Sequence, residues 1–225
     1  MTFSLVGRCP RTGMLGVVVS SSSPAVAARC AYARADTAAA ASQNVTDPRL
    51  GPRLLDLAGQ GIAAPDAVAR LVAEEPLIAH RQLAVVDRDG ASAVHSGEQT
   101  LGLHAARAEP DAAAAGNLLA DPAVPQAMLE AFAAMPQEDL GARLVAALRA
   151  GLEAGGEAGP VRSAGMLVVD RVPWPVADLR VDWHDDPIPQ LASLWALWQP
   201  QLDDYLKRAL DPGSAPGYGV PGDVR

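Results

Sequence analysis

The sequence predicts an α+β protein in which antiparallel sheets carry helices on their outer faces. Short β-branched and apolar runs come in adjacent pairs joined by turn residues, a pattern typical of hairpins. Helical patterns also come in pairs between these hairpins, whereas a doubly wound parallel sheet alternates single strands with single helices. With 49% hydrophobic and 20% charged residues, the 225-residue chain has a globular composition.

The first predicted hairpin starts directly after Met1. Residues 2–8 (TFSLVGR) are β-prone, CPRTG supplies the turn, and residues 14–20 (MLGVVVS) form a buried second strand. A serine-rich loop and a short connection of helical character follow at 20–34. We assign a third strand to 35–44 because this stretch is short and lies between turn signals, although its alanines favour helix.

The middle of the chain predicts two helices and then three strands. Residues 47–61 begin with Asp47 as N-cap and end in glycine, and residues 64–76 follow as a second helix. The clearest hairpin is HRQLAVVDRDGASAVHSG, where DRDG forms the turn. A further strand at 111–120 bends at Gly116.

The last part predicts two helices, a strand pair and a final helical region. The helices are 121–135, with Asp121 as N-cap, and 137–156, which ends in a glycine-rich stretch. Strands at 162–172 and 174–184 precede a helical region at 185–210 that is interrupted near Pro200. We expect one domain over 1–210, and a Pro- and Gly-rich tail at 211–225 that is mobile or wraps a neighbour.

Charge and cysteine content exclude several classes of function. The formal net charge of −8 repels phosphate backbones, so we expect no nucleic-acid partner. Two cysteines, Cys9 and Cys30, cannot build a disulfide framework. The sequence has no apolar run of membrane-spanning length and no signal-peptide pattern. We therefore expect a cytoplasmic protein with no membrane partner.

Metal and phosphate motifs are missing from the sequence. There is no CxxC pair, HExxH, Walker loop or strand-borne GxGxxG, and the four histidines are scattered. The HDDP stretch at His184 fits a solvated turn or a helix cap better than a metal site. We expect no metal and no cofactor.

Thr2 is the candidate nucleophile. Methionine aminopeptidase removes Met1 when the next side chain is small, which would place the Thr2 hydroxyl beside its own α-amine. A hydroxyl needs a nearby base, and an α-amine with a pKa near ~8 serves as one. Many proteins begin with Met-Thr without catalytic meaning. Here, however, the threonine starts the first strand of a buried hairpin, which would hold it rigidly.

The opening TFSLVGRCPRTGMLGVVVSS resembles that of N-terminal nucleophile (Ntn) hydrolases, whose fold is a four-layer αββα sandwich. Nearly the whole chain resembles the DUF1028 family, an uncharacterised branch of that superfamily, through stretches such as GVVVSSSSPAV, ASQNVTDPRLGPRLLDL, RQLAVVD, AVHSG, AGNLLA, RSAGMLVVDRVPWPVADLRVDWHDDPI and PGYGVPGD. The resemblance implies Thr2 as nucleophile and its α-amine as base. Proteasome-type relatives also use a lysine on the third strand, but the one lysine here is Lys207, which argues against peptidase activity.

Three residues are expected close to Thr2. Ser21 ends the strand that pairs with the first strand, so its hydroxyl can orient the amine or relay a proton. Asn117 is a candidate oxyanion donor, or else a strand-end cap. Ser163 precedes AGMLVV, matches a stretch that lies near the nucleophile in the superfamily, and is a candidate for substrate binding.

Four more residues are candidates for substrate binding. Gln43 and Asn44 end the third strand just before a helix, where amide groups could hold an oxyanion or a carboxylate. Arg81 starts a central strand with Gln82 and would bind a substrate carboxylate, or else form an internal ion pair. His95 ends the partner strand and is either a substrate contact or a structural histidine.

These residues predict an N-terminal-threonine amidohydrolase that cleaves an amide bond of a small, carboxylated molecule through an acyl-enzyme. The alternative is a non-catalytic binding or structural module of the same fold, with Met1 retained and Thr2 inert. Tryptophans near the tail also favour a homo-oligomer, a dimer or larger, although core packing is the commoner fate of such residues: Trp174, Trp183, Trp195 and Trp198.

Overall fold

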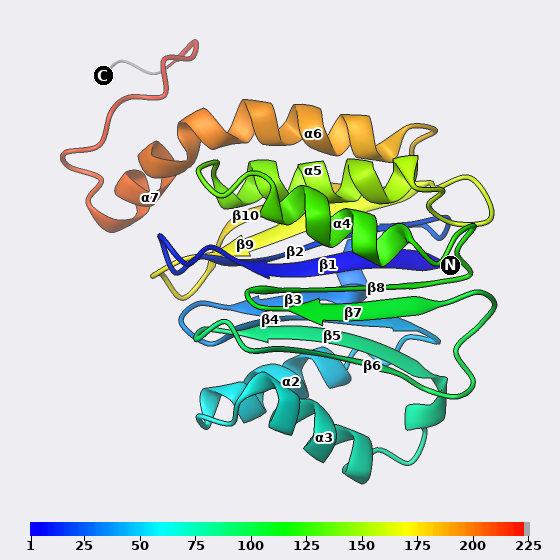
Figure 1. Cartoon of the computed structure of the whole chain (residues 1–225). Coiled ribbons are helices and arrows are strands. Elements are labelled where there is room, and N and C mark those ends of the chain that lie inside the picture. Colours follow the sequence, from blue (N-terminus) through cyan, green and yellow to red (C-terminus); the bar gives the residue numbers. More distant parts are fainter. Residues whose placement is uncertain (223–225) are drawn as a thin grey trace.

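Figure 1 shows the computed structural model, which describes residues 1–222 as two antiparallel sheets stacked face to face. The large sheet has the strand order β10-β9-β2-β1-β8-β7, and the small sheet has the order β3-β4-β5-β6. All neighbouring strands pair antiparallel, as predicted. The strands are β1 (Thr2–Arg8), β2 (Leu15–Ser21), β3 (Ala31–Arg34), β4 (Ala38–Asn44), β5 (Arg81–Asp87), β6 (Ser92–Ser96), β7 (Ala105–Glu109), β8 (Ala112–Asn117), β9 (Ser163–Val169) and β10 (Pro175–Val181).

Helices cover the outer face of each sheet, which gives a mixed α/β architecture (Figure 1). The large sheet is covered by α4 (Val124–Ala133), α5 (Leu140–Glu153) and α6 (Pro187–Trp198). The small sheet is covered by α2 (Leu50–Gly59) and α3 (Ala64–Glu74). Short helices complete the chain: α1 (Ala27–Cys30), η1 (Ile78–His80), η2 (Gln199–Gln201) and α7 (Leu202–Leu210).

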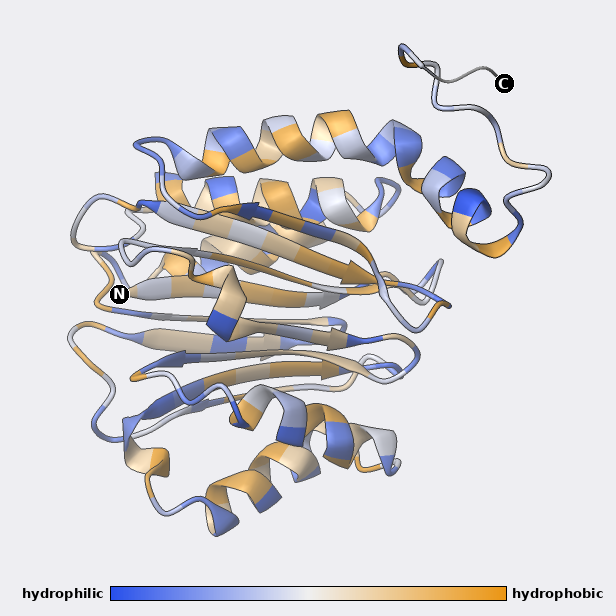
Figure 2. Cartoon of the chain, turned by 180° about the vertical axis from the view of Figure 1, so that it is seen from behind, coloured by the Kyte–Doolittle hydropathy of each residue, from blue (hydrophilic) through white to orange (hydrophobic). Residues whose placement is uncertain are grey.

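Three apolar layers separate the elements. One lies between the large sheet and its helices, and a second lies between the small sheet and α2 and α3. The third lies between the two sheets and consists almost entirely of alanine and valine side chains. In Figure 2 the helices carry both apolar and polar residues, as expected where one helix face is buried and the other is solvated.

Two edge strands were missing from the predicted order. Residues 31–34, predicted as a connection, form β3 at one edge of the small sheet, and residues 105–109 form β7 at one edge of the large sheet. Both strands are short, and neither is fully buried, because each has a strand on one side only. Without a buried face they lack the apolar alternation that marks a strand in the sequence.

Three helices start later than predicted: α2, α4 and α5, the last of which begins at Leu140 and not at residue 137. The N-caps of α2 and α4 are Arg49 and Ala123, not Asp47 and Asp121. Each aspartate instead forms a turn ahead of its helix: Asp47 Oδ1 accepts from the Arg49 N–H at 3.0 Å, and Asp121 Oδ1 accepts from the Ala123 N–H at 2.7 Å. Such turns share the aspartate preference of true N-caps, so the sequence does not distinguish the two.

The C-terminal segment folds back on the chain itself. The Arg208 side chain on α7 donates to the carbonyl oxygens of Pro216 (3.2 Å) and Gly217 (3.0 Å), and it lies 4.2 Å from the Tyr218 ring centroid. Residues 223–225, the end of the predicted tail, lie outside the described residues. Over residues 1–222, no helix has both the length and the apolar character needed to cross a membrane.

The tryptophans have different environments. Trp195 is on the buried face of α6. The indole N–H of Trp198 donates to the Val176 carbonyl at 2.9 Å. Trp174 and Trp183 are exposed. The contact between α5 and α6 depends on Gly141, because a Cβ at this position would overlap the Trp195 ring.

We predict that Gly141→Ala lowers the free energy of unfolding by about 1–3 kcal/mol, the usual cost of overpacking a core. This loss occurs even though alanine is favoured over glycine in a helix by about 1 kcal/mol. Urea denaturation measures the change. Gly59→Ala at the end of α2 is the control, because the atom nearest to a Cβ at Gly59 is Nη1 of the flexible Arg34 side chain, at 3.4 Å. Equal effects of the two substitutions would contradict the prediction.

Candidate active site

Thr2 begins a strand that is paired on both sides. It is the first residue of β1, which lies between β2 and β8 in the large sheet. Thr2 faces Asn117 in the register with β8, and the next residue faces Ser20 of β2. Its side chain is only 6% exposed. The sheet therefore fixes the position of the Thr2 hydroxyl.

Two hydroxyl groups converge on the carbonyl oxygen of Met1. The Thr2 hydroxyl donates to it at close range, and the Ser21 hydroxyl donates to it at 2.5 Å. The two hydroxyl oxygens lie 3.5 Å apart, and the Ser23 N–H donates to the Ser21 oxygen at 3.0 Å. Ser21 thus lies beside Thr2, where the hairpin predicts it. Both hydroxyl groups are hydrogen-bonded to the Met1 carbonyl oxygen.

Ser163 supports the loop that follows Ser21. It faces Ser21 in the register of β2 and β9, and its hydroxyl donates to the Ser23 carbonyl at 2.6 Å. The Ser20 hydroxyl donates to the Ser163 carbonyl at 2.9 Å. These contacts make Ser163 a neighbour of Ser21 that holds the serine loop in place.

Glu157 is a buried carboxylate at this site that the sequence analysis missed. It lies in the loop between α5 and β9, is 4% exposed, and accepts from the Ser22 N–H with both oxygens at 3.1 Å. Burial raises its pKa from 4.5 to about 7, although the bonds from Ser22 and the charge of the N-terminal amine act to lower it. A carboxyl group that titrates near neutrality therefore lies near the start of the chain.

A buried amide network joins the two sheets next to Thr2. The Gln43 side-chain N–H group donates to Gln82 Oε1 at 2.9 Å, and the Asn117 side-chain N–H group donates to the same oxygen at 3.1 Å. The Ser4 hydroxyl donates to Gln43 Oε1 at 2.6 Å. Gln82 is the centre of this network, and its own N–H group donates to the Ser96 hydroxyl at 3.0 Å.

Asn117 has one unused polar atom. Its Oδ1 is buried and, among residues 1–222, has no hydrogen-bond partner. The Asn117 NH2 group has two N–H donors, and one of them donates to Gln82 Oε1. The side chain therefore also offers an unpaired acceptor on the strand opposite Thr2. An unpaired buried acceptor is costly and is a natural place for a donor to bind.

The remaining candidates, Asn44, Arg81 and His95, contact other groups. The Asn44 side chain donates to the His80 carbonyl at 2.6 Å and accepts from the Leu101 N–H at 3.2 Å. The Arg81 guanidinium donates to the Val45 carbonyl. The Nε atom of Arg81 and the Nε2 atom of His95 are buried without a partner among residues 1–222.

The structure thus brings Ser21 to the Thr2 hydroxyl and places Asn117 opposite Thr2 in the sheet. It places Ser163 against Ser21, and it joins Gln43 and Asn117 through the same Gln82 oxygen. It describes no contact between Thr2 and the other three candidates. Among the described residues, no three His, Cys, Asp or Glu side chains form a group that could hold a metal ion.

We predict that Glu157→Gln changes how stability depends on pH. Folding raises the pKa of Glu157 from 4.5 to about 7. The free energy of unfolding of the wild type is therefore unaffected by this group below pH 4.5, and it falls as the pH rises from 4.5 to about 7. The stability of the variant relative to the wild type should therefore increase over this interval, by up to roughly 3 kcal/mol. Urea denaturation at several pH values measures the difference.

Glu153→Gln is the matched control, because Glu153 is exposed on α5, close in sequence to Glu157. Its stability should follow the wild type at every pH. Parallel pH profiles for Glu157→Gln and the wild type would contradict the assignment of a raised pKa to Glu157.

Comparison with known proteins places the chain in a family. The family of unknown function DUF1028 matches residues 2–191. The fold is similar to the crystal structure of protein SPO2555 from Silicibacter pomeroyi, also assigned to DUF1028, with a TM-score of 0.80 and 31% sequence identity. That similarity covers 87% of this chain and 88% of the other, whereas no curated protein matches. The chain therefore belongs to the DUF1028 family, whose function is unknown.

Proposed function

We propose that this protein is an N-terminal-threonine amidohydrolase with the four-layer αββα sandwich of the Ntn hydrolases. The observation that carries the proposal is the position of the Thr2 hydroxyl. It lies at the start of a central strand, 3.5 Å from the Ser21 hydroxyl and against a carbonyl group. Loss of Met1 would expose this hydroxyl together with the Thr2 α-amine. No cofactor is needed for the reaction.

In the proposed reaction the Thr2 hydroxyl oxygen bonds to the amide carbonyl carbon of the substrate. Its proton passes to the α-amine, and a tetrahedral oxyanion forms. The ammonium group then gives the proton to the departing nitrogen, the C–N bond breaks, and an ester remains on Thr2. Water attacks this ester with the α-amine again as base, which releases a carboxylic acid and restores the hydroxyl.

Three neighbours have roles in this proposal. The Ser21 hydroxyl already donates to a carbonyl oxygen, that of Met1, and would donate in the same way to the substrate carbonyl. The unpaired Asn117 Oδ1 would accept from the α-ammonium group. Glu157, whose pKa is about 7, would balance the charge of that ammonium group at the start of the chain.

The lysine content and the contacts of Arg81 bear on the class of substrate. The one lysine, Lys207, lies in α7, so the third-strand lysine of proteasome-type relatives is missing, which favours a small amide over a protein substrate. Arg81, the predicted partner for a substrate carboxylate, donates to the Val45 carbonyl.

The rival proposal is a binding or structural module in which Met1 is retained. One observation favours it: the Met1 carbonyl accepts from both hydroxyls and closes the site over Thr2. The two proposals differ in the first residue of the purified protein and in whether Thr2 is needed for activity.

We predict that the protein expressed from its own start codon, without a tag, lacks Met1. Intact-mass spectrometry should show a single species lighter by one methionine residue, with threonine as the first residue on sequencing. The small threonine side chain permits this cleavage. Quantitative retention of Met1 would contradict the amidohydrolase proposal and favour the module.

We predict that Thr2→Ala lowers amide hydrolysis by roughly 10³-fold or more, because it removes the nucleophile while still permitting removal of Met1. A panel of small amides followed by amine release measures the rate. Thr2→Ser keeps a hydroxyl and is the matched control that should retain activity. Mass spectrometry during turnover should find an acyl group on Thr2. Equal activity of the wild type and Thr2→Ala would exclude Thr2 as the nucleophile.

A further inference from the structure

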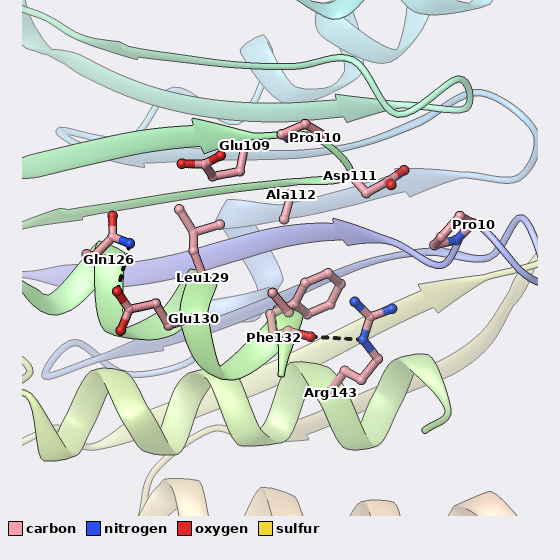
Figure 3. Close-up of a pocket in the computed structure, with 11 residues that line it drawn as sticks. Pro10, Glu109, Pro110, Asp111, Ala112, Gln126, Leu129, Glu130, Phe132 and Arg143 are labelled. Atoms are coloured by element: carbon pink, nitrogen blue, oxygen red, sulfur yellow. Dashed lines mark hydrogen bonds between the residues drawn. The ribbon is translucent and has the colours of Figure 1, made fainter. Parts of the chain in front are cut away.

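A second site lies at the opposite end of β1 from Thr2. A cavity of about 400 Å³ lies between α4, the β7–β8 hairpin and α5. Figure 3 shows the residues that line it. Its apolar lining includes Pro10, Ala112, Leu129 and Phe132. Because β1 spans seven residues at about 3.3 Å each, this cavity lies on the order of 20 Å from the Thr2 hydroxyl. Its volume is in the range of small-molecule sites.

Arg143 contributes a buried positive charge to this cavity. It is 5% exposed, its Nε–H donates to the Phe132 carbonyl at 3.0 Å, and its guanidinium carbon lies 3.9 Å from the Phe132 ring centroid. Within residues 1–222, no carboxylate oxygen lies within 4.0 Å of it. Burial lowers its pKa, whereas the Cys9 thiol and the negative charge of Asp111 act in the opposite direction. A buried cation without a carboxylate partner is costly, so an anion bound here would be stabilised strongly.

The acidic residues around the cavity are already engaged or lie at its rim. Asp111 pairs with Arg8 at 2.7 Å, and Glu130 accepts from the Gln126 side chain at 2.9 Å. Glu109 and Glu130 are exposed. Asp111 attracts the Arg143 guanidinium electrostatically, but its salt bridge is with Arg8. The carboxylates at the rim repel any anion, and they repel a ligand with more than one negative charge most strongly.

The Phe132 side chain that supports Arg143 is held in place by the sheet. Its ring lies against Gly7 of β1, where a Cβ would come within 2.6 Å of the ring. The absence of a side chain at Gly7 therefore lets Phe132 pack on the strand. Since Arg143 bonds to the carbonyl group and lies over the ring of the same residue, the guanidinium is oriented before any ligand binds.

We propose that this cavity is a binding site for a small monocarboxylate with an apolar body. The carboxylate would accept two hydrogen bonds from the Arg143 guanidinium, whose planar geometry matches it. The apolar part would lie against Leu129, Phe132 and Ala112. This site is independent of the reaction proposed for Thr2.

Phenylacetate and its neutral analogue phenylacetamide test the proposal. The full-length protein is titrated with each, and amide chemical shifts are followed by NMR. Phenylacetate should bind saturably and shift the resonances of α4 and the start of α5. Phenylacetamide should bind at least about tenfold more weakly, because it lacks the charge-assisted bonds to Arg143. Equal affinity for the two compounds, or no saturable binding of phenylacetate, would overturn the proposal.

A pair of exposed alanines on α4 gives a test that spares Arg143 itself. Ala133 lines the cavity, so Ala133→Trp should fill part of it and weaken phenylacetate binding at least about tenfold. Ala134 is also exposed but does not line the cavity, so Ala134→Trp should bind like the wild type. Unchanged binding by Ala133→Trp would place phenylacetate elsewhere and overturn the proposal. Because both positions are exposed, folding of the variants does not decide the outcome.

Discussion

The close stacking of the two sheets over small side chains is the constraint on which the rest of the structure depends. The layer between them contains fully buried alanines at the centre of each sheet, among them Ala39, Ala41, Ala113 and Ala115. Larger residues would hold the sheets further apart. At the short separation, the Gln43 side chain from the small sheet reaches the Ala115 carbonyl of the large sheet at 3.1 Å. The amide network of Gln43, Gln82 and Asn117 can thus form because the side chains between the two sheets are small.

Most of the fold could be predicted from the sequence because its central elements combine several signals. The strands β1, β2 and β5 are rich in apolar residues and are bounded by turn residues. The helices show their buried face at helical spacing. The edge strands β3 and β7 lacked such signals, because a strand with one neighbour and an exposed face needs little apolar pattern. The starts of α2 and α4 were misplaced because an aspartate turn and an N-cap favour the same residue.

The candidate site divides in the same way. Ser21 could be placed beside Thr2 because the two belong to one hairpin, whose register follows from its turn. Glu157 could not, because a loop about 135 residues further along the chain brings it there through a backbone bridge between Leu119 and Glu157. In the sequence, Glu157 is an acidic residue in the glycine-rich stretch GGEAG, and no motif distinguishes it from the other acids. The central role of Gln82 is also a property of the sheet pair, since its partners come from β4, β6 and β8.

The position of Met1 has a consequence for the shape of the molecule at this end. Its carbonyl group lies between the Thr2 and Ser21 hydroxyls, and its side chain extends toward Gly159. While Met1 is present, its carbonyl group therefore covers the Thr2 and Ser21 hydroxyls at the end of β1. Met1 is 38% exposed, and its departure would uncover the hydroxyl groups of Thr2 and Ser21 together.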